Sequence, residues 1–168
     1  MFKKNDYVVY GASGVCKIMD VSTIDMMGGD KERLYYTLQP LNAKDSQIYT
    51  PVDNEKIIIR SVISKDEANE LIDEITEIPE IWIQVDKLRE EKFKEAIKSC
   101  DCKEWIKVIK TIYLRKQERI AQGKKITATD EKYFRMAEDH LYSELSVALD
   151  IEKNEIGDYI KNKIDKDM

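Results

Sequence analysis

Residues 2–18, FKKNDYVVYGASGVCKI, decide the fold of the first third of this 168-residue chain. Tyr7–Tyr10 predicts a short strand, because aromatic and β-branched residues fit a pleated surface. Gly11 and Gly14 flank a turn, since glycine accepts backbone conformations that other residues avoid. A second apolar stretch follows at once, over residues 14–24. The chain therefore opens with two strands joined by a glycine-flanked turn.

Three more strands alternate with turns as far as residue 63. The paired glycines within residues 26–30 predict a turn, and Pro51 ends a later strand. The strands predicted after the opening pair are residues 32–38, 47–50 and 57–59. Five short strands in about 60 residues are typical of a small antiparallel barrel of SH3 or Tudor type.

The pattern changes from strands to helices at Ser64. Ser64 and Glu67 have the spacing of a capping box, in which each side chain bonds the backbone of the other residue at a helix start. Gly123 predicts a helix end. Helices are expected from residue 64, from 83 or 86 to 98, and over 103–121, 130–149 and 152–164. The sequence thus predicts an α+β protein, with a small antiparallel β-barrel over residues 1–63 and an all-α helical domain over 64–168.

Composition argues against several classes of protein. No positively charged start precedes an apolar stretch of signal-peptide length, and no run reaches the roughly 20 apolar residues of a membrane span. A cytoplasmic protein without a membrane segment is therefore expected. The three cysteines, Cys16, Cys100 and Cys102, are odd in number and include no C-x-x-C pair. Neither a disulfide framework nor a zinc site is predicted.

No group of residues predicts catalysis. His140 is the single histidine, and it lies in the middle of a predicted helix, which favours a structural role. Neither a Ser-His or Cys-His arrangement nor a phosphate-binding loop can be drawn. We therefore expect neither enzyme activity nor a cofactor.

The basic residues are concentrated in one segment. A formal net charge of −5 would by itself discourage binding to nucleic acid, which depends on Lys and Arg. Residues 103–137, however, hold ten basic and four acidic side chains, whereas residues 64–102 hold six and twelve. Two interpretations of the basic segment stay open. It is either a solvated helix face or a surface that follows phosphates without reading the sequence of the DNA.

The two tryptophans have different surroundings. Trp105 shares helical spacing with Ile109 and Ile112 and is expected in the core. Trp82 comes shortly after Pro79 and ahead of a charged helix. It is either packed between helices or exposed, where it would insert beside a base step of DNA as apolar wedges do.

Several motifs resemble the CarD family of bacterial transcription regulators. The opening FKKNDYVVYGASGV is similar to the start of the family's N-terminal domain, which transcription-repair coupling factor shares. The stretch IYTPVDN at residues 48–54, followed by residues 57–60, resembles the end of that domain. Downstream, the similar positions are Trp82, Asp86, Arg89, Phe93, the RKQER stretch at residues 115–119, and Lys132.

The resemblance implies a function and a set of residues. Family members meet the lobe of the RNA polymerase β subunit through an exposed strand edge of the barrel. This points to Ile48, Tyr49, Thr50 and Pro51. Family members also stabilise the open promoter complex, with the tryptophan wedged at the upstream edge of the melted DNA. The DNA-binding residues that the resemblance and the basic segment imply are Trp82, Arg89, Arg115, Lys116, Arg119, Lys124, Lys125 and Lys132.

Two functions of different classes follow from the sequence. The first is a transcription regulator that joins RNA polymerase to upstream promoter DNA. The second is a protein-interaction adaptor, whose barrel binds a strand or peptide and whose helices make no contact with DNA. DNA binding by the segment from Ser64 onward discriminates between them.

Overall fold

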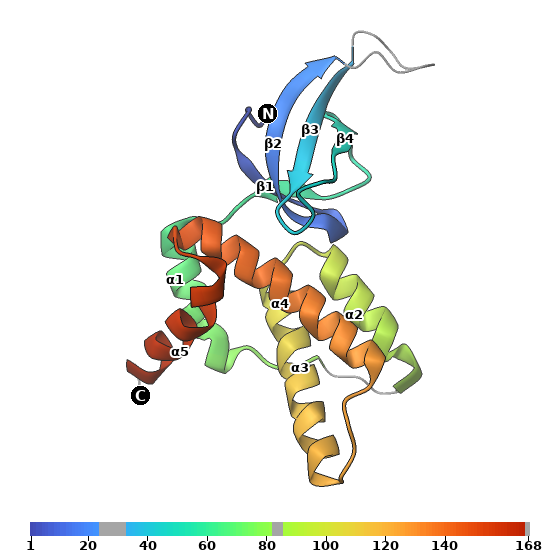
Figure 1. The fold of residues 1–168 in the computed structure, drawn as a ribbon, viewed down its shortest axis with the longest axis vertical. Coiled ribbons are helices and arrows are strands. Elements are labelled where there is room, and N and C mark those ends of the chain that lie inside the picture. Colours follow the sequence, from blue (N-terminus) through green and yellow to red (C-terminus); the bar gives the residue numbers. More distant parts are fainter. Residues whose placement is uncertain (24–32, 82–85, 167–168) are drawn as a thin grey trace. The chain divides into compact units, whose positions relative to one another are not determined.

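The computed structural model describes residues 1–23, 33–81 and 86–166. The chain divides into two compact units, Met1–Val62 and Ile63–Met168, which we call the barrel unit and the helical unit (Figure 1). The predicted α+β order, with a small antiparallel barrel followed by helices, is confirmed. The turn predicted within residues 26–30 lies outside the described residues.

A five-stranded antiparallel sheet in the order β4-β3-β2-β1-β5 forms the barrel unit. Its strands are β1 (Tyr7–Tyr10), β2 (Gly14–Thr23), β3 (Leu34–Pro40), β4 (Ile48–Pro51) and β5 (Ile59–Ser61). The predicted glycine-flanked turn is a short 3₁₀ turn over Gly11–Ser13 that joins β1 to β2. At Gly11, φ is +45° and an added Cβ would lie 2.7 Å from Cγ2 of Ile57. The positive φ and the short distance to Ile57 therefore both favour glycine at position 11.

The central strands share an apolar core. Its buried members are Val8, Tyr10, Cys16, Ile18, Tyr36 and Leu38. The hydroxyl of Tyr10 donates a hydrogen bond to Oγ1 of Thr50 at 3.1 Å, which joins β1 to β4. Burial raises the pKa of the Cys16 thiol to about 12. Cys16 is therefore a packing residue rather than a reactive thiol.

The last strand begins two residues later than the sequence predicts, at Ile59 rather than Ile57. Its register is set by β1, which places Ile59 opposite Tyr10. Ile57 and Ile58 precede the strand and are 41% and 50% exposed. Strand propensity identified a β-forming stretch but not the pairing that decides which isoleucine enters the sheet.

The helical unit contains all the helices that the sequence predicts. They are α1 (Lys65–Glu74), α2 (Arg89–Lys98), α3 (Cys102–Ala121), α4 (Ala128–Leu149) and α5 (Ile156–Lys166), with 3₁₀ turns η2 (Ile75–Glu77), η3 (Asp86–Leu88) and η4 (Lys153–Glu155). The helix α5 is held on α1, because the Tyr159 hydroxyl donates to Asn69 Oδ1 at 2.7 Å. Among the described helices, none combines the length and the apolar character needed to cross a membrane.

Local capping explains where these helices begin and end. Ser64 and Glu67 form the predicted capping box, since each side chain accepts a hydrogen bond of 3.1 Å from the backbone N–H of the other residue. The α3 helix ends just before Gly123, which has a φ of +75°. The next N–H, of Lys124, then turns back to the carbonyl of Arg119 at 2.7 Å. Gly123 is therefore the helix terminator that the sequence predicts.

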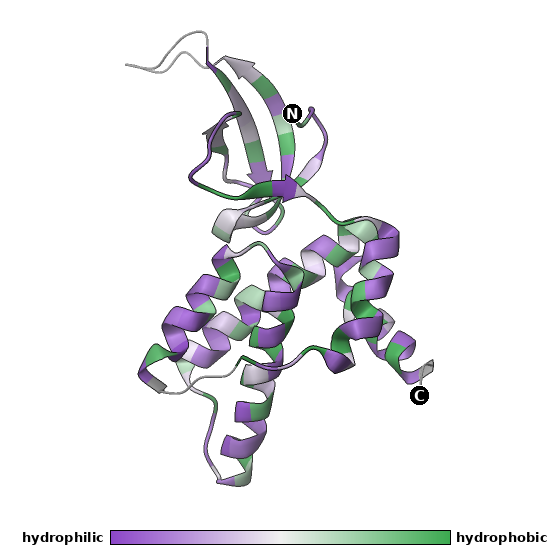
Figure 2. Cartoon of the chain, turned by 180° about the vertical axis from the view of Figure 1, so that it is seen from behind, coloured by the Kyte–Doolittle hydropathy of each residue, from purple (hydrophilic) through white to green (hydrophobic). Residues whose placement is uncertain are grey.

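The core of the helical unit forms around Trp105, which has no exposed surface. Its ring lies 5.3 Å from the ring of His140 on α4. Phe93 of α2 and Leu145 of α4 are also fully buried. Figure 2 shows hydrophobic and hydrophilic bands interchanging along these helices, as expected when one face of each helix is packed. The prediction that Trp105 is a core residue is confirmed, and His140 is buried beside it.

Replacing Trp105 with alanine should destabilise the helical unit severely. Removing a fully buried tryptophan leaves a cavity and costs on the order of 3–5 kcal/mol, a large part of the roughly 5–15 kcal/mol that keeps a domain folded. Thermal unfolding followed by far-UV circular dichroism measures this loss. Tyr113→Ala is the matched control, because Tyr113 lies on the same helix and is 53% exposed. Equal shifts in melting temperature for the two variants would contradict the prediction.

Candidate functional site

The outer edge of β4 carries backbone groups that face away from the sheet. β4 is a terminal strand in the sheet order. The N–H of Val52 donates to the carbonyl of Leu34 on the β3 side at 3.1 Å. Hydrogen-bonded and non-hydrogen-bonded pairs alternate along an antiparallel ladder. Thr50 therefore bonds to β3, whereas the N–H and C=O of Tyr49 point outward.

The four residues predicted to bind RNA polymerase differ in what they present. Tyr49 offers both an outward backbone and a side chain that is 48% exposed. The side chain of Thr50 is buried, and its Oγ1 also accepts a hydrogen bond from Nδ2 of Asn54 at 2.9 Å. Ile48 packs against the barrel core, and Pro51 has no N–H to donate. The exposed recognition groups on β4 therefore centre on Tyr49.

The opposite edge of the sheet, β5, is partly blocked. The N–H of Gly11 donates to the carbonyl of Ile58 at 2.9 Å, so the same alternation directs the carbonyl of Ser61 outward. That carbonyl accepts a hydrogen bond of 2.9 Å from Nη1 of Arg60. A charged side chain over an edge carbonyl disfavours pairing with another strand. Of the two edges of this sheet, β4 is therefore the better template for an incoming strand.

The exposed cations of the predicted DNA-binding set lie toward the end of α3, in the turn after it, and at the start of α4. They are Lys116, Lys124, Lys125 and Lys132; outside that set, Lys103, at the start of α3, and Arg135, on α4, are also exposed. Arg119 is half-buried, and its Nε donates to the carbonyl of Lys125 at 2.6 Å. This contact holds the turn after α3 against the helix. The four lysines are thus the members of the predicted DNA-binding set whose side chains the structure leaves most exposed.

Two other members of that set converge on one buried carboxylate. Asp130, in the first turn of α4, has no exposed surface. Its Oδ1 lies 2.9 Å from Nε of Arg89 on α2, and its Oδ2 lies 3.0 Å from Nε of Arg115 on α3. The side chains of Arg89 and Arg115 are only 14% and 28% exposed. Both arginines therefore have a structural partner, and their contact with DNA stays a prediction.

Sequence reasoning did not identify Asp130 as a partner of these arginines. Its only signal was its place as one of four acidic residues in the strongly basic segment 103–137. Thr127 caps α4 by accepting a hydrogen bond from the Asp130 N–H at 3.1 Å. The cap fixes the carboxylate at the helix start, where the helix dipole also favours negative charge.

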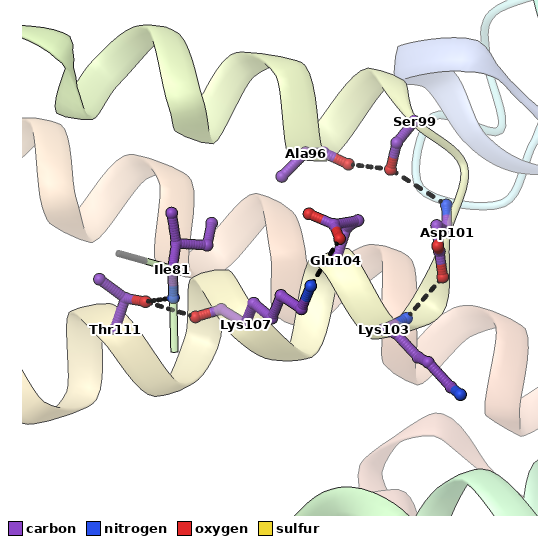
Figure 3. A network of polar contacts seen from close by, with 8 residues as sticks. All are labelled: Ile81, Ala96, Ser99, Asp101, Lys103, Glu104, Lys107 and Thr111. Carbon is purple, nitrogen blue, oxygen red and sulfur yellow. Dashed lines mark hydrogen bonds and ion pairs between the residues drawn. The ribbon is translucent and has the colours of Figure 1, made fainter. Parts of the chain in front are cut away.

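Trp82 lies outside the described residues, but the residues just before it are well anchored. The N–H of Ile81 donates to Oγ1 of Thr111 on α3 at 2.8 Å (Figure 3). The carbonyl of Ile78 accepts from Nζ of Lys110 at 2.6 Å. Burial lowers the pKa of the Lys110 ammonium, and the nearby carboxylate of Glu80 opposes this shift. The chain before Trp82 is therefore bound to α3 at two points.

An open groove of about 450 Å³ lies beside this segment. It is lined by Ile78, Pro79, Glu80, Lys110, Tyr113 and Leu114. Across the described ranges, no three His, Cys, Asp or Glu side chains come close enough together to hold a metal ion. The barrel unit thus offers a backbone edge, and the helical unit offers cations and apolar surface, and features of both kinds suit binding.

The comparisons with known proteins agree with this arrangement. Residues 2–63 match the CarD-like/TRCF RID domain, and residues 74–161 match the CarD C-terminal domain. No curated protein matches the chain. The second match alone covers more than half of the sequence, and the two follow one another in the order that the motifs predicted. The chain therefore belongs to the CarD family of RNA polymerase-interacting transcription regulators.

Proposed function

We propose that this protein binds the lobe of the RNA polymerase β subunit with its barrel unit and promoter DNA with its helical unit. In this proposal it stabilises the open promoter complex from the upstream edge of the melted region. The observation that supports it best is the outer edge of β4, where the backbone N–H and C=O of Tyr49 face away from the sheet. Membership of the CarD family supports the choice of RNA polymerase as the partner.

The polymerase contact is a strand added to β4. A strand from the partner would pair with the outward groups of Tyr49, and such backbone hydrogen bonds supply much of the affinity in this mode of recognition. The exposed ring of Tyr49 adds apolar contact area. Ile48, Thr50 and Pro51 shape the edge from within the barrel.

The DNA contact combines cations and an aromatic wedge. Lys116, Lys124, Lys125 and Lys132 are exposed at neighbouring helix ends and would follow phosphates, a contact that carries no sequence code. Trp82 would insert beside a base step. Arg89, Arg115 and Arg119 complete the proposed set, although each is also held by a contact within the protein.

The energetic requirement is differential binding. A regulator shifts the balance between closed and open promoter complexes only if it binds the open form more tightly. A wedge at the edge of the melted region meets this condition, because unstacked bases are present there only after melting. Cations alone do not favour the open complex, because phosphates are present in both the closed and the open promoter complex.

One observation favours the adaptor function instead. The net charge is −5, and Asp130 already neutralises part of the charge of Arg89 and Arg115. The adaptor would bind polymerase through β4 in the same way and would lack salt-dependent DNA binding. The salt dependence of DNA binding by the full chain, with polymerase present, separates the two functions.

Tyr49→Pro should weaken binding to core RNA polymerase by roughly ten-fold or more, because proline removes an outward donor and a bound strand loses at least one hydrogen bond. The variant should stay folded, since the Tyr49 N–H does not bond to β3. Affinity is measured by pull-down with purified core polymerase, and folding by circular dichroism. Tyr49→Ala keeps the N–H and is the control that separates backbone from ring. Unchanged binding by a folded Tyr49→Pro protein argues against the strand-edge mode.

Lys124→Ala combined with Lys125→Ala should lower the salt slope of DNA binding by roughly one to two units, because each lost phosphate contact lowers the slope by about one. Binding to duplex DNA is measured by fluorescence anisotropy over a range of salt concentrations. Lys3→Ala with Lys4→Ala removes the same charge from exposed lysines of the barrel unit and should leave the slope unchanged. Equal slopes for both double variants would mean that the basic turn does not contact phosphates.

Trp82→Ala should shorten the lifetime of the open complex while leaving thermal stability nearly unchanged. A wedge acts on DNA and is not needed for folding, whereas a core tryptophan costs on the order of 3–5 kcal/mol to remove. Lifetimes are measured by competitor challenge of preformed open complexes, and stability by thermal unfolding. If Trp82→Ala lowers the melting temperature as much as Trp105→Ala does, Trp82 is structural and the wedge is wrong.

A further inference from the structure

The ladder between β3 and β4 directs a backbone carbonyl outward just before β4 begins. The N–H of Val52 bonds to the carbonyl of Leu34, and the register continues as far as Ile48 opposite Leu38. Since hydrogen-bonded pairs recur every second residue, the N–H of Ile48 also points at β3. The carbonyl of Gln47 belongs to the same planar trans peptide unit and points the opposite way. It therefore faces outward, on the same edge as the backbone groups of Tyr49.

The other end of this edge is closed at Pro51. Pro51 lies at an outward position of β4, where its missing N–H leaves the ladder with β3 intact. Its carbonyl accepts a hydrogen bond of 3.1 Å from the N–H of Asn54. Asn54 is itself tied to the strand, because its Nδ2 donates to Oγ1 of Thr50 at 2.9 Å. A strand that pairs with Tyr49 therefore continues toward Gln47 and not past Pro51.

Gln47 and Tyr49 also present their side chains together. The hydroxyl of Tyr49 donates to Oε1 of Gln47 at 3.0 Å, and both residues are exposed. Residues two apart in an extended chain lie on one face, as this bond requires. It occupies the amide oxygen and leaves the Nε2 group, with its two N–H donors, to face a partner. The edge thus carries a side-chain donor beside its backbone groups.

We propose that Gln47 is a second recognition residue for the polymerase strand. An antiparallel strand pairs one of its residues with Tyr49, and the residue two positions further donates its N–H to the carbonyl of Gln47. The side chain of that further residue lies on the same face as the Gln47 amide. A carboxylate or amide oxygen on it matches the donors of Nε2. The inference rests on the proposed pairing at β4, and it names the side-chain chemistry of the partner.

Gln47→Glu tests this chemistry, because it keeps the shape of the side chain and replaces its donors with acceptors. Affinity of the full chain for purified core RNA polymerase should fall by about ten-fold or more, since two acceptors then face each other. Gln47→Met only removes the donors and should cost about two- to ten-fold, the range for one lost hydrogen bond. Circular dichroism checks that each variant is folded. Tighter binding by Gln47→Glu means that a donor faces Gln47 and overturns the proposed chemistry, and unchanged affinity in both variants overturns the role of Gln47.

Glu55→Gln is the matched control, because it makes the reverse exchange of the same two groups beyond the closed end of the edge. Glu55 is exposed and follows Asn54 directly. Its substitution should leave the affinity for polymerase unchanged. If Glu55→Gln strengthens binding by as much as Gln47→Glu weakens it, the net charge of the barrel unit explains both effects, and the specific contact of Gln47 is wrong.

Tyr49→Phe tests whether the hydroxyl orients the amide, since it removes the hydroxyl and keeps the ring and the backbone. Gln47→Met should then cost less in the Tyr49→Phe background than in the natural sequence, because the two residues act as a pair. An equal cost in both backgrounds overturns the orienting role of Tyr49.

Tyr49→Pro separates this inference from the proposed function. If Tyr49→Pro weakens polymerase binding whereas Gln47→Glu and Gln47→Met do not, strand pairing at β4 stands and the role of Gln47 is wrong. If a folded Tyr49→Pro protein binds polymerase unchanged, the pairing at β4 itself fails, and the role of Gln47 fails with it. Weakened binding in all three variants, with Glu55→Gln unchanged, is the expected result.

Discussion

Asp130 is a carboxylate without exposed surface, and two guanidinium groups from different helices bind its two oxygens at 2.9 and 3.0 Å. An isolated buried carboxylate costs several kcal/mol in lost hydration. The start of α4 can therefore be buried only while Arg89 and Arg115 are in place. The positions of α2 and α3 relative to α4 depend on this requirement, and with them the geometry of the basic surface.

A second buried carboxylate on α4 has a similar role at the other end of the helix. Glu144 has no exposed surface, and it accepts the N–H of Ile63 at 2.9 Å and the thiol of Cys102 at 3.1 Å. Ile63 is the first residue of the helical unit, and Cys102 is the first residue of α3. The helix α4 thus uses carboxylates at both ends to hold chain segments that enter other helices. Buried polar groups that are satisfied in this way favour a single arrangement over alternatives.

Much of the fold could be predicted from the sequence, because periodicity and capping are local. The capping box at Ser64, the terminator Gly123 and the core position of Trp105 all follow from spacing within a few residues. The shift of β5 could not be predicted in this way, since its register is decided by β1, some fifty positions earlier along the chain. The ion pairs of Asp130 join positions 89, 115 and 130. A pattern of neighbouring residues in the sequence does not predict such a long-range contact. A basic residue in a sequence therefore indicates a charge, but only the fold decides whether that charge faces solvent or a buried partner.

At the strand edge, too, the sequence indicates which residues are present, and only the fold decides which groups are exposed. The sequence identified residues 47–50 as a strand ended by Pro51, yet the ladder between β3 and β4 decides which backbone groups face away from the sheet. Alternation directs Tyr49 outward and keeps Thr50 bonded within the sheet. A shift of one residue would reverse this and would place the buried Thr50 side chain on the opposite face. The outward direction of the Tyr49 backbone therefore depends on the register of β4, which the hydrogen bonds that Thr50 accepts from Tyr10 and Asn54 help to fix.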